Sequence, residues 1–343
     1  MKRLLITLLI IPALLLTAPP VTAFPEDADA SPAIPDAPAA AEEKEATVSA
    51  EGLNPLPMDD YRAYGPAPDE SCFRKGRHIY SGADTFDDWS YIDRSIAVYV
   101  WREWRDDCCF NVARIRIADP SQLRTALERD NIKLNNYVSE IAKAKNAVIA
   151  CGGEFLAHPR NKSSYCVRMG VTLRDKGIRA HDALIIDRNG DFHITNGFSA
   201  EKLEELEESG IEAVNVFNFG PVLVLDGEQQ YHRGEKAHYT NTSPNSPNPR
   251  TAIGQLGPLE YLMVVTDGRE VQSPLPDGGT RQHLGCTIVT LTEFMASYHC
   301  IQAYNLDGGN STAMYFDGGT FSTSVRRGVT DIIYFATLAD PGN

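Results

Sequence analysis

Short stretches of alternating or continuous apolar residues recur along most of the chain, separated by polar and glycine-containing segments. This pattern is typical of strands, which bury one or both faces over five to seven residues. The stretches with this pattern lie at residues 95–101, 111–117, 146–150, 213–217, 222–225, 261–265, 300–304 and 331–336. Two more, 181–187 and 191–195, flank Asn189-Gly190, a dipeptide typical of tight hairpin turns. The pattern therefore predicts a fold dominated by strands.

Four segments show the spacing or the capping signals of helices. Asp119-Pro120 is a cap followed by proline, and Leu123, Ala126 and Leu127 follow at helical spacing. Further helices are expected at 136–145, at 200–209 behind the cap Ser199, and at 291–298. We therefore expect an α+β fold, with a mixed, mostly antiparallel sheet core, flanking helices and an active site at strand ends.

The first 60 residues are unlike the rest of the chain. Residues 1–23 combine a basic start, an apolar run and a small-residue end, which predicts a secretory signal cleaved after Ala23. An uncleaved membrane anchor is the alternative, but the apolar run is short and contains three prolines. Residues 24–60, rich in Ala, Pro, Glu and Asp, are expected to form a disordered tether. We expect an N-terminal extension over 61–94 and a catalytic domain over 95–338 to follow. The protein would then be secreted or extracytoplasmic, without stable membrane insertion.

Charge and cysteine content narrow the class of protein. The formal net charge of -14 leaves no basic surface for nucleic acid, so an anionic substrate would have to meet a local arginine pocket. Seven cysteines in an exported chain favour some disulfides with at least one thiol left over, and none has the spacing of a zinc site. The disulfide pairing and the oligomeric state stay open.

Four polar motifs follow or adjoin the apolar stretches, and they carry the candidate chemistry. The most informative is 305–312, which places a carboxylate, two glycines and two hydroxyls directly after a strand. Glycine admits positive φ and removes the Cβ that would keep a ligand from the backbone. The other motifs are Gly152-Gly153-Glu154, Arg250-Thr251 and Asp267-Gly268-Arg269. If these ends converge at one sheet edge they form a pocket, although each Asp-Gly is alternatively a plain turn and each arginine a surface ion pair.

The ordered set of motifs resembles the phosphodiester glycosidase family, whose bacterial members are often described as exopolysaccharide biosynthesis proteins. The resemblance rests on the segments 146–153, 220–227, 250–254, 266–269 and 305–312 and covers roughly 95–336. It implies hydrolysis of a sugar 1-phosphodiester, with release of the free sugar and a phosphomonoester, so the expected partner is a carbohydrate or glycan phosphodiester. Two positions depart from the family pattern: Glu154-Phe155 follow the paired glycines where two phenylalanines and an asparagine are usual, and Asn310 replaces a glycine.

A phosphodiester is a good leaving group, so this chemistry needs positive charge on the departing phosphate more than a proton donor. Arg250 and Arg269 are expected to supply that charge, and Asp307 or Asp267 to act as general base or nucleophile. The expected substrate-binding residues are Gly152, Gly153, Glu154, Thr251, Asn305, Gly308, Gly309, Ser311 and Thr312. No cofactor and no metal ligand is assigned. Calcium binding by the oxygens of Asp307, Asn305 and Asp267 is an alternative to hydrogen bonds with turn amides.

Two other functions fit the same motifs. The chain is alternatively a non-catalytic glycan-binding or exopolysaccharide-assembly protein that keeps the pocket without turnover. It is alternatively a glycosidase acting on ordinary glycosidic bonds, which needs a proton donor, and Glu154 is then the candidate acid.

Overall fold

The computed structural model of the protein describes residues 48–76, 85–156, 165–175, 181–239, 243–323 and 327–340. The expected signal at 1–23 and most of the expected tether lie outside the described residues. All described residues belong to one compact unit. Among them, no helix is long and apolar enough to cross a membrane.

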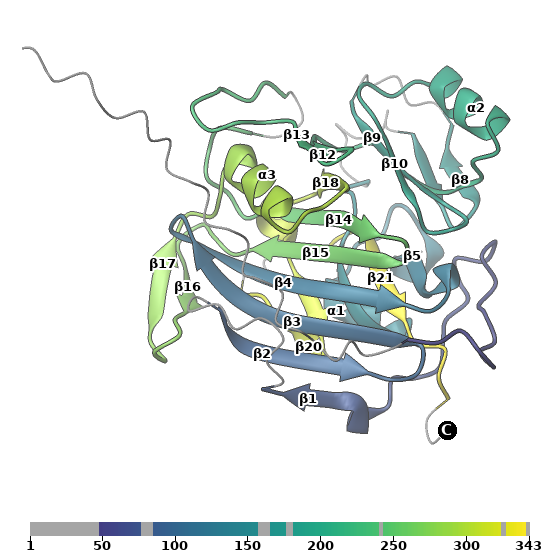
Figure 1. Cartoon of the computed structure of the whole chain (residues 1–343), viewed down its shortest axis with the longest axis horizontal. Helices are drawn as coiled ribbons and strands as arrows, with labels where there is room; N and C mark the ends of the chain where they lie inside the picture. The colour runs from purple at the N-terminus through teal and green to yellow at the C-terminus, as the bar shows by residue number, and fades with distance from the viewer. Residues whose placement is uncertain are drawn as a thin grey trace, which may run out of the picture. The chain divides into compact units, whose positions relative to one another are not determined.

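Nine strands form the large sheet, which runs across Figure 1. Neighbouring strands are antiparallel throughout, and β4 pairs with β15 over seven residues without a break. In spatial order, the strands are β1 (Phe73–Lys75), β2 (Thr85–Ile92), β3 (Ile96–Arg105), β4 (Cys108–Ile117), β15 (Glu260–Thr266), β14 (Thr251–Gly257), β18 (Gln302–Leu306), β12 (Val222–Leu225) and β13 (Glu228–Gln229). The sheet therefore gathers two of the polar motifs, because the start of β14 lies beside the end of β18.

The other strands of the described segments form two five-stranded sheets and a hairpin. The second sheet has the order β20 (Gly319–Thr320), β19 (Met314–Phe316), β6 (Ala147–Gly152), β21 (Asp331–Ala336) and β5 (Leu123–Leu127). The side sheet has the order β10 (Phe192–Thr195), β9 (Ala183–Asp187), β11 (Ala213–Phe217), β7 (Cys166–Arg168) and β8 (Val171–Arg174). The hairpin pairs β16 (Val271–Pro274) with β17 (Thr280–His283).

Apolar packing arranges these elements in layers. The main core lies between the large sheet and the second sheet, and it also takes Leu184 and Phe217 from the side sheet. On its other face the large sheet is covered by α3 (Ile288–Ser297), and the second sheet is likewise covered by α1 (Val138–Ala144). Because both faces of these sheets are buried, strands such as β6 and β21 are apolar at nearly every position.

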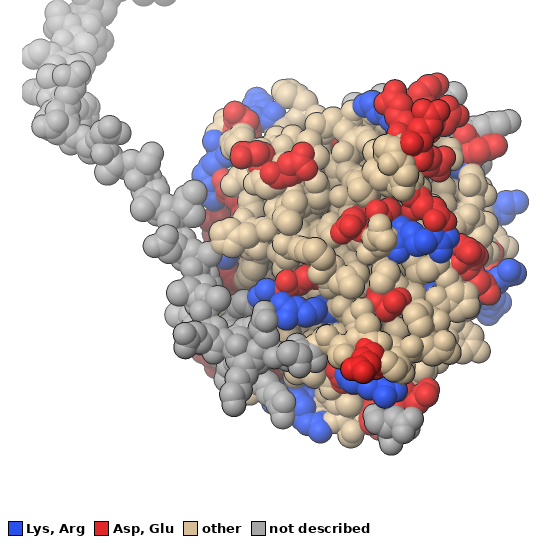
Figure 2. Space-filling model, turned by 45° about the vertical axis from the view of Figure 1, so that its right-hand side comes forward, with Lys and Arg blue, Asp and Glu red and all other residues tan. Residues whose placement is uncertain are grey.

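The third helix, α2 (Ala200–Glu208), covers the outer side of the side sheet, with Leu203 in the core and Ser199 as its cap. Its glutamates face solvent, and they form the acidic group at the upper right of Figure 2. Among the described residues, short 3-10 turns occupy Glu70–Cys72, Pro120–Gln122, Glu128–Asp130 and Gly309–Ser311. The predicted helices at 136–145, 200–209 and 291–298 are therefore confirmed within a few residues.

The predicted helix after Asp119-Pro120 is wrong. Asp119 does cap a turn, with the reciprocal contacts of a capping box, but the turn ends at Gln122 and β5 begins. All five residues of β5 are buried, and each pairs with a residue of β21. Burial on both faces makes a strand apolar at successive positions, so its spacing also satisfies a helical pattern. The expected mostly antiparallel core is confirmed, and every pairing among the described strands is antiparallel.

The cysteines differ from expectation. All seven are free thiols in the structure, so none of the expected disulfides is present. Six are buried, and five of these pack among apolar side chains as small hydrophobic residues do: Cys108, Cys151, Cys166, Cys286 and Cys300. Burial raises the pKa of the Cys166 thiol to about 12, which keeps it protonated and unreactive at neutral pH.

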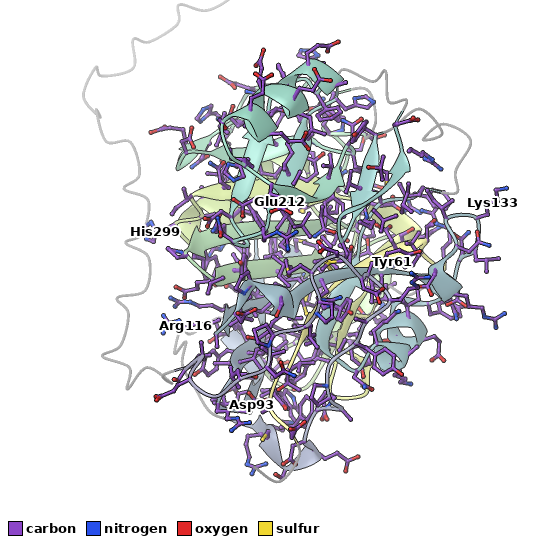
Figure 3. The ribbon with its side chains drawn as sticks, turned by 90° about the vertical axis from the view of Figure 1, so that its right-hand side faces the viewer. Tyr61, Asp93, Arg116, Lys133, Glu212 and His299 are labelled. Atoms are coloured by element: carbon purple, nitrogen blue, oxygen red, sulfur yellow. The ribbon has the colours of Figure 1, made fainter. Side chains whose placement is uncertain are left out.

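Residues 56–65 are fastened to the second sheet by Arg124, which lies on β5 and is fully buried. Its guanidinium donates to the carbonyl oxygen of Pro57 from both terminal nitrogens, each at 3.2 Å, and to the carbonyl oxygen of Asp60. Tyr61 is buried as a result and lies against the body of the fold in Figure 3, in contrast to Lys133 at its margin. The segment is therefore part of the folded unit.

Replacing Arg124 with leucine should destabilise the protein by about 2–4 kcal/mol, because buried carbonyl groups lose their donors. Urea unfolding would measure the loss, and limited proteolysis should show cleavage within 48–65. Arg233→Leu is the control, since the Arg233 side chain is 68% exposed and its ion pairs are superficial. Equal stability of the two variants would show that Arg124 does not hold this segment.

Candidate active site

The three sheets meet at the end of β6, where Gly152, Gly153 and Glu154 follow one another. The Gly153 amide donates to the carbonyl oxygen of Asp331, at the start of β21, over 3.0 Å. The Asp307 amide, at the end of β18, donates to the carbonyl oxygen of Gly153, also over 3.0 Å. Backbone hydrogen bonds thus bring two of the predicted motifs, 152–154 and 305–312, into direct contact.

Arg168, at the end of β7, is the centre of this junction, and it is completely buried. Nη2 lies 2.7 Å from Oε2 of Glu154 and 2.8 Å from Oδ2 of Asp331, and Nε also donates to the Asp331 carboxylate. Nη1 donates to the carbonyl oxygens of Val167 and Val216. All of its donor groups are therefore satisfied, and the three ionic side chains form the Arg168 network (Glu154, Arg168 and Asp331).

The network explains the glycine at 153. A Cβ at that position would lie 2.6 Å from Oδ2 of Asp331, so any other residue would displace the carboxylate. The Glu154 amide donates to Oδ1 of Asp331, and Oε1 of Glu154 accepts from the Asn218 amide over 2.7 Å. Burial raises the pKa of Glu154 to about 7 against the opposing effect of Arg168, and it raises that of Asp331 too.

Asp307 lies beside this network but has a different partner. Its Oδ2 accepts from Nη2 of Arg327 over 3.1 Å, and Nε of Arg327 donates to the Ser311 hydroxyl over 3.0 Å. The Arg327 guanidinium also lies over the ring of Phe155, 3.9 Å from its centroid. Burial raises the pKa of Asp307 to about 6, while hydrogen bonding by Ser311 and the charge of Arg327 oppose the increase.

A second arginine, Arg269, follows β15 and contacts the turn that carries Asp307. Nη1 of Arg269 donates to the Asn310 side-chain oxygen over 2.6 Å, and Nη2 lies 2.9 Å from where a Cβ on Gly309 would be. Gly309 has φ of +64°, and a Cβ on Gly308 would lie 2.6 Å from the Pro249 carbonyl oxygen. These glycines therefore admit protein groups to the turn. Their binding of a ligand remains a prediction.

Arg250 and Asp267, both predicted as catalytic, are largely buried in contacts within the protein. Arg250 donates to the carbonyl oxygens of Cys286, Ser243 and Ser246, and so ties the segment before β14 to the segment before α3. The Asp267 carboxylate accepts from three side chains and one backbone amide, provided by Asn111, Ser273 and Thr323. In this arrangement both residues hold neighbouring segments together, and their direct part in chemistry remains a prediction.

Several predicted substrate-binding residues carry buried polar atoms that have no partner among the described residues. These atoms are Oγ1 of Thr251, Oγ1 of Thr312 and Oδ1 of Asn305. The amide nitrogen of Asn305 donates to the Gly220 carbonyl oxygen over 2.7 Å, which fixes the orientation of its side chain. Each atom is able to accept a hydrogen bond from a hydroxyl group, the group that a sugar offers most often.

The residues proposed for calcium are divided between two networks. Asp307 is bonded to Arg327, whereas Asp267 is bonded to Asn111, Ser273 and Thr323. Within the described ranges, no three His, Cys, Asp or Glu side chains gather as a metal site would require. The structure therefore offers no preformed acidic cluster around Asp307.

Arg327, Arg168 and Asp331 are the important residues that the sequence analysis missed. Arg168 lies in a strand of three residues and has no local motif. Arg327 is 20 residues from Asp307 in the sequence and contacts it only in the folded protein. Asp331 had a weak signal, because it is a carboxylate at the first position of an otherwise apolar strand. Only the pairing between sheets shows that these residues meet.

Known proteins share both the motifs and the fold. The phosphodiester glycosidase family model matches residues 145–336, which is more than half of the chain. The chain belongs to the phosphodiester glycosidase family. The matched range contains both the Arg168 network and the Asp307–Arg327 pair, so both groups are part of the family domain of this chain.

Two known proteins are similar to this chain, one in sequence and one in fold. The SPbeta prophage-derived uncharacterized protein YomE of Bacillus subtilis is 25% identical over 203 residues, which are 57% of this chain and 29% of that protein. The chain thus spans less than a third of that relative. The catalytic domain of zebrafish N-acetylglucosamine-1-phosphodiester alpha-N-acetylglucosaminidase, auto-inhibited by its pro-peptide, superposes with a TM-score of 0.52 at 15% identity, covering 84% of this chain and 99% of that one. The two proteins therefore share a fold.

The Arg168 network yields a stability prediction for the phosphodiester glycosidase domain. Arg168→Met should destabilise it by about 3–5 kcal/mol, because two buried carboxylates lose their counter-ion. Adding Glu154→Gln and Asp331→Asn to that variant should restore part of the loss, since the uncompensated charges disappear. Urea unfolding of the single and triple variants measures both effects. A triple variant no more stable than Arg168→Met would contradict the electrostatic explanation.

Proposed function

We propose that this protein is a secreted hydrolase that cleaves a sugar 1-phosphodiester, releasing the free sugar and a phosphomonoester. The observation that carries the proposal is the position of Asp307, a buried carboxylate that accepts a hydrogen bond from Arg327 and lies on a turn whose Asn310 accepts one from Arg269. Membership of the phosphodiester glycosidase family and the fold shared with the zebrafish enzyme support it.

The chemistry needs a group near the anomeric carbon and positive charge near the phosphate. Asp307 supplies the first, either as nucleophile or as the base that activates water. Arg269 and Arg327 supply the second, because a guanidinium stabilises the charge that develops on a departing phosphate. The chain has a formal net charge of -14, so an anionic substrate would be attracted to the site by these two local cations.

Glu154 is a poor proton donor in this arrangement, although its pKa is raised. Its Oε1 accepts from the Asn218 amide and its Oε2 from Arg168, and only 2% of the side chain is exposed. A general acid for an ordinary glycosidic bond must reach the leaving oxygen. The geometry therefore favours a substrate whose leaving group departs without being protonated, as the phosphate of a sugar 1-phosphodiester does.

Export is part of the proposal. Residues 1–23 have the basic, apolar and small-residue parts of a secretory signal, and the substrate would then be an extracytoplasmic glycan or polymer. Mass spectrometry of the protein purified from the producing cell should give an N-terminus at Phe24.

Release of free sugar from a panel of sugar 1-phosphodiesters and matched aryl glycosides tests the activity. We expect turnover of the phosphodiesters, lowered about 10²–10⁴-fold in Asp307→Ala and about 10²–10³-fold in Arg269→Ala. Arg129→Met is the control, because that side chain is 82% exposed. Cleavage of aryl glycosides alone would indicate a glycosidase, and glycan binding without any product would indicate a binding or assembly protein.

The pH dependence follows from the ionisation of Asp307. A base or nucleophile acts as the carboxylate, so kcat/KM should rise with pH through the pKa of the free enzyme, about 6. Asp307→Asn should remove this acidic limb together with most of the activity. A limb that persists unchanged in the residual activity of Asp307→Asn would assign it to another group.

A further inference from the structure

Two arginine–carboxylate pairs lie next to each other at the candidate site, and they differ in exposure. The pair of Arg168 with Asp331 is 0% exposed on both side chains. In the pair of Arg327 with Asp307, 38% of the arginine side chain is exposed but only 12% of the aspartate. A ligand from solvent can therefore reach the Arg327 side chain of the second pair and neither member of the first.

The contacts of Arg327 hold its guanidinium in place while leaving donors available. One face lies on the ring of Phe155, and one edge is bonded to the Ser311 hydroxyl and to Asp307. Of its nitrogens, Nε and Nη2 make these bonds, and Nη1 makes none to any described residue. A phosphoryl oxygen approaching from solvent would meet Nη1, and bidentate capture of the phosphate would also need Nη2, which is bonded to Asp307 in the free protein.

Asp307, by contrast, depends on this one cation. Arg327 is its ion-pair partner and Ser311 its second hydrogen-bonding neighbour, while the nearby Asp331 repels it. A carboxylate held by a guanidinium is a weaker nucleophile and base than a free one, because the cation stabilises the ionised form. The arrangement in the free protein thus holds Asp307 in a restrained state.

We propose that Arg327 changes partner when substrate binds, leaving the Asp307 carboxylate for a phosphoryl oxygen, so that phosphate recognition itself releases Asp307 for reaction. The inference rests on the proposed function and deepens it, since it makes the phosphate a requirement for catalysis as well as a leaving group. No covalent bond changes in this step: one ion pair is exchanged for another. A glycoside without a phosphate would leave Arg327 on Asp307 and would react slowly.

The test is the affinity for inorganic phosphate, measured by calorimetry on the whole protein at pH 8 and constant ionic strength. If Asp307 and phosphate compete for Arg327, Asp307→Asn should bind phosphate about tenfold more tightly than the wild type, within the range of usual coupling between sites. Arg327→Met should lose most phosphate binding, and Arg327→Lys should keep part of it. Arg129→Met should match the wild type.

A second measurement needs no variant that alters Asp307. In the wild type, the side-chain Nε–H resonance of Arg327, assigned by its loss in Arg327→Lys, should shift as phosphate is added. Phosphate should also accelerate hydrolysis of an activated aryl glycoside by the wild type about tenfold, and leave Arg327→Met unaffected. Equal phosphate affinity of Asp307→Asn and wild type would overturn the exchange, and so would an Arg327 resonance that does not move when phosphate binds.

The two proposals fail in different ways. If phosphate binds as expected but no sugar phosphodiester is hydrolysed, the partner exchange stands and the proposed function is wrong. If phosphodiesters are hydrolysed but Asp307→Asn and wild type bind phosphate equally, the function stands and the exchange is wrong.

Discussion

The buried guanidinium of Arg168 is the interaction on which the junction of the three sheets depends. An arginine removed from water is costly unless every donor is bonded and its charge is matched. Here one cation is shared by Glu154 and Asp331, and the remaining donors meet the carbonyl oxygens of β7 and β11. Because Asp331 begins β21 and Glu154 follows β6, the network fixes where these strands end, and through Gly153 it fixes the backbone of Asp307.

The fully buried Arg168 network and the partly exposed pair of Arg327 with Asp307 have different consequences for function. Arg168 is inaccessible and satisfied, so it serves as a permanent support for the backbone around Asp307. Arg327 is accessible from solvent and shares its charge with a single carboxylate. A site built in this way has a rigid base and one exchangeable cation at its surface, which suits the capture of a phosphate in a protein that is acidic overall.

The sequence predicted the fold in outline because strand periodicity is a local signal. The segments 213–217, 222–225 and 331–336 are strands within the predicted limits, and the hairpin at Asn189-Gly190 is present. The same signal failed for β5, where burial on both faces imitates helical spacing. The disulfides were inferred from the compartment, and composition contains no information on whether two cysteines lie within bonding distance.

The candidate site was predictable only in part, for a related reason. Strand ends with glycines pointed to the meeting of 152–154 with 305–312, which the backbone contacts confirm. Arg168 and Arg327 carry no motif, because their importance comes from pairing across sheets and not from their neighbours in the chain. Sequence analysis gave Arg250 and Asp267 catalytic roles, which remain predictions; the structure adds that both side chains are bonded to neighbouring loops.

In the proposed reaction, the bond that breaks joins a phosphate oxygen to the anomeric carbon, and Asp307 acts on the sugar side. Hydrolysis of a sugar 1-phosphodiester in ¹⁸O-labelled water, followed by ³¹P NMR and by mass spectrometry of the sugar, shows which bond breaks. We expect the label to enter the sugar and the phosphomonoester to stay unlabelled. Label in the phosphomonoester or in a sugar phosphate would show attack at phosphorus, and would contradict the assignment of the protein as a glycosidase.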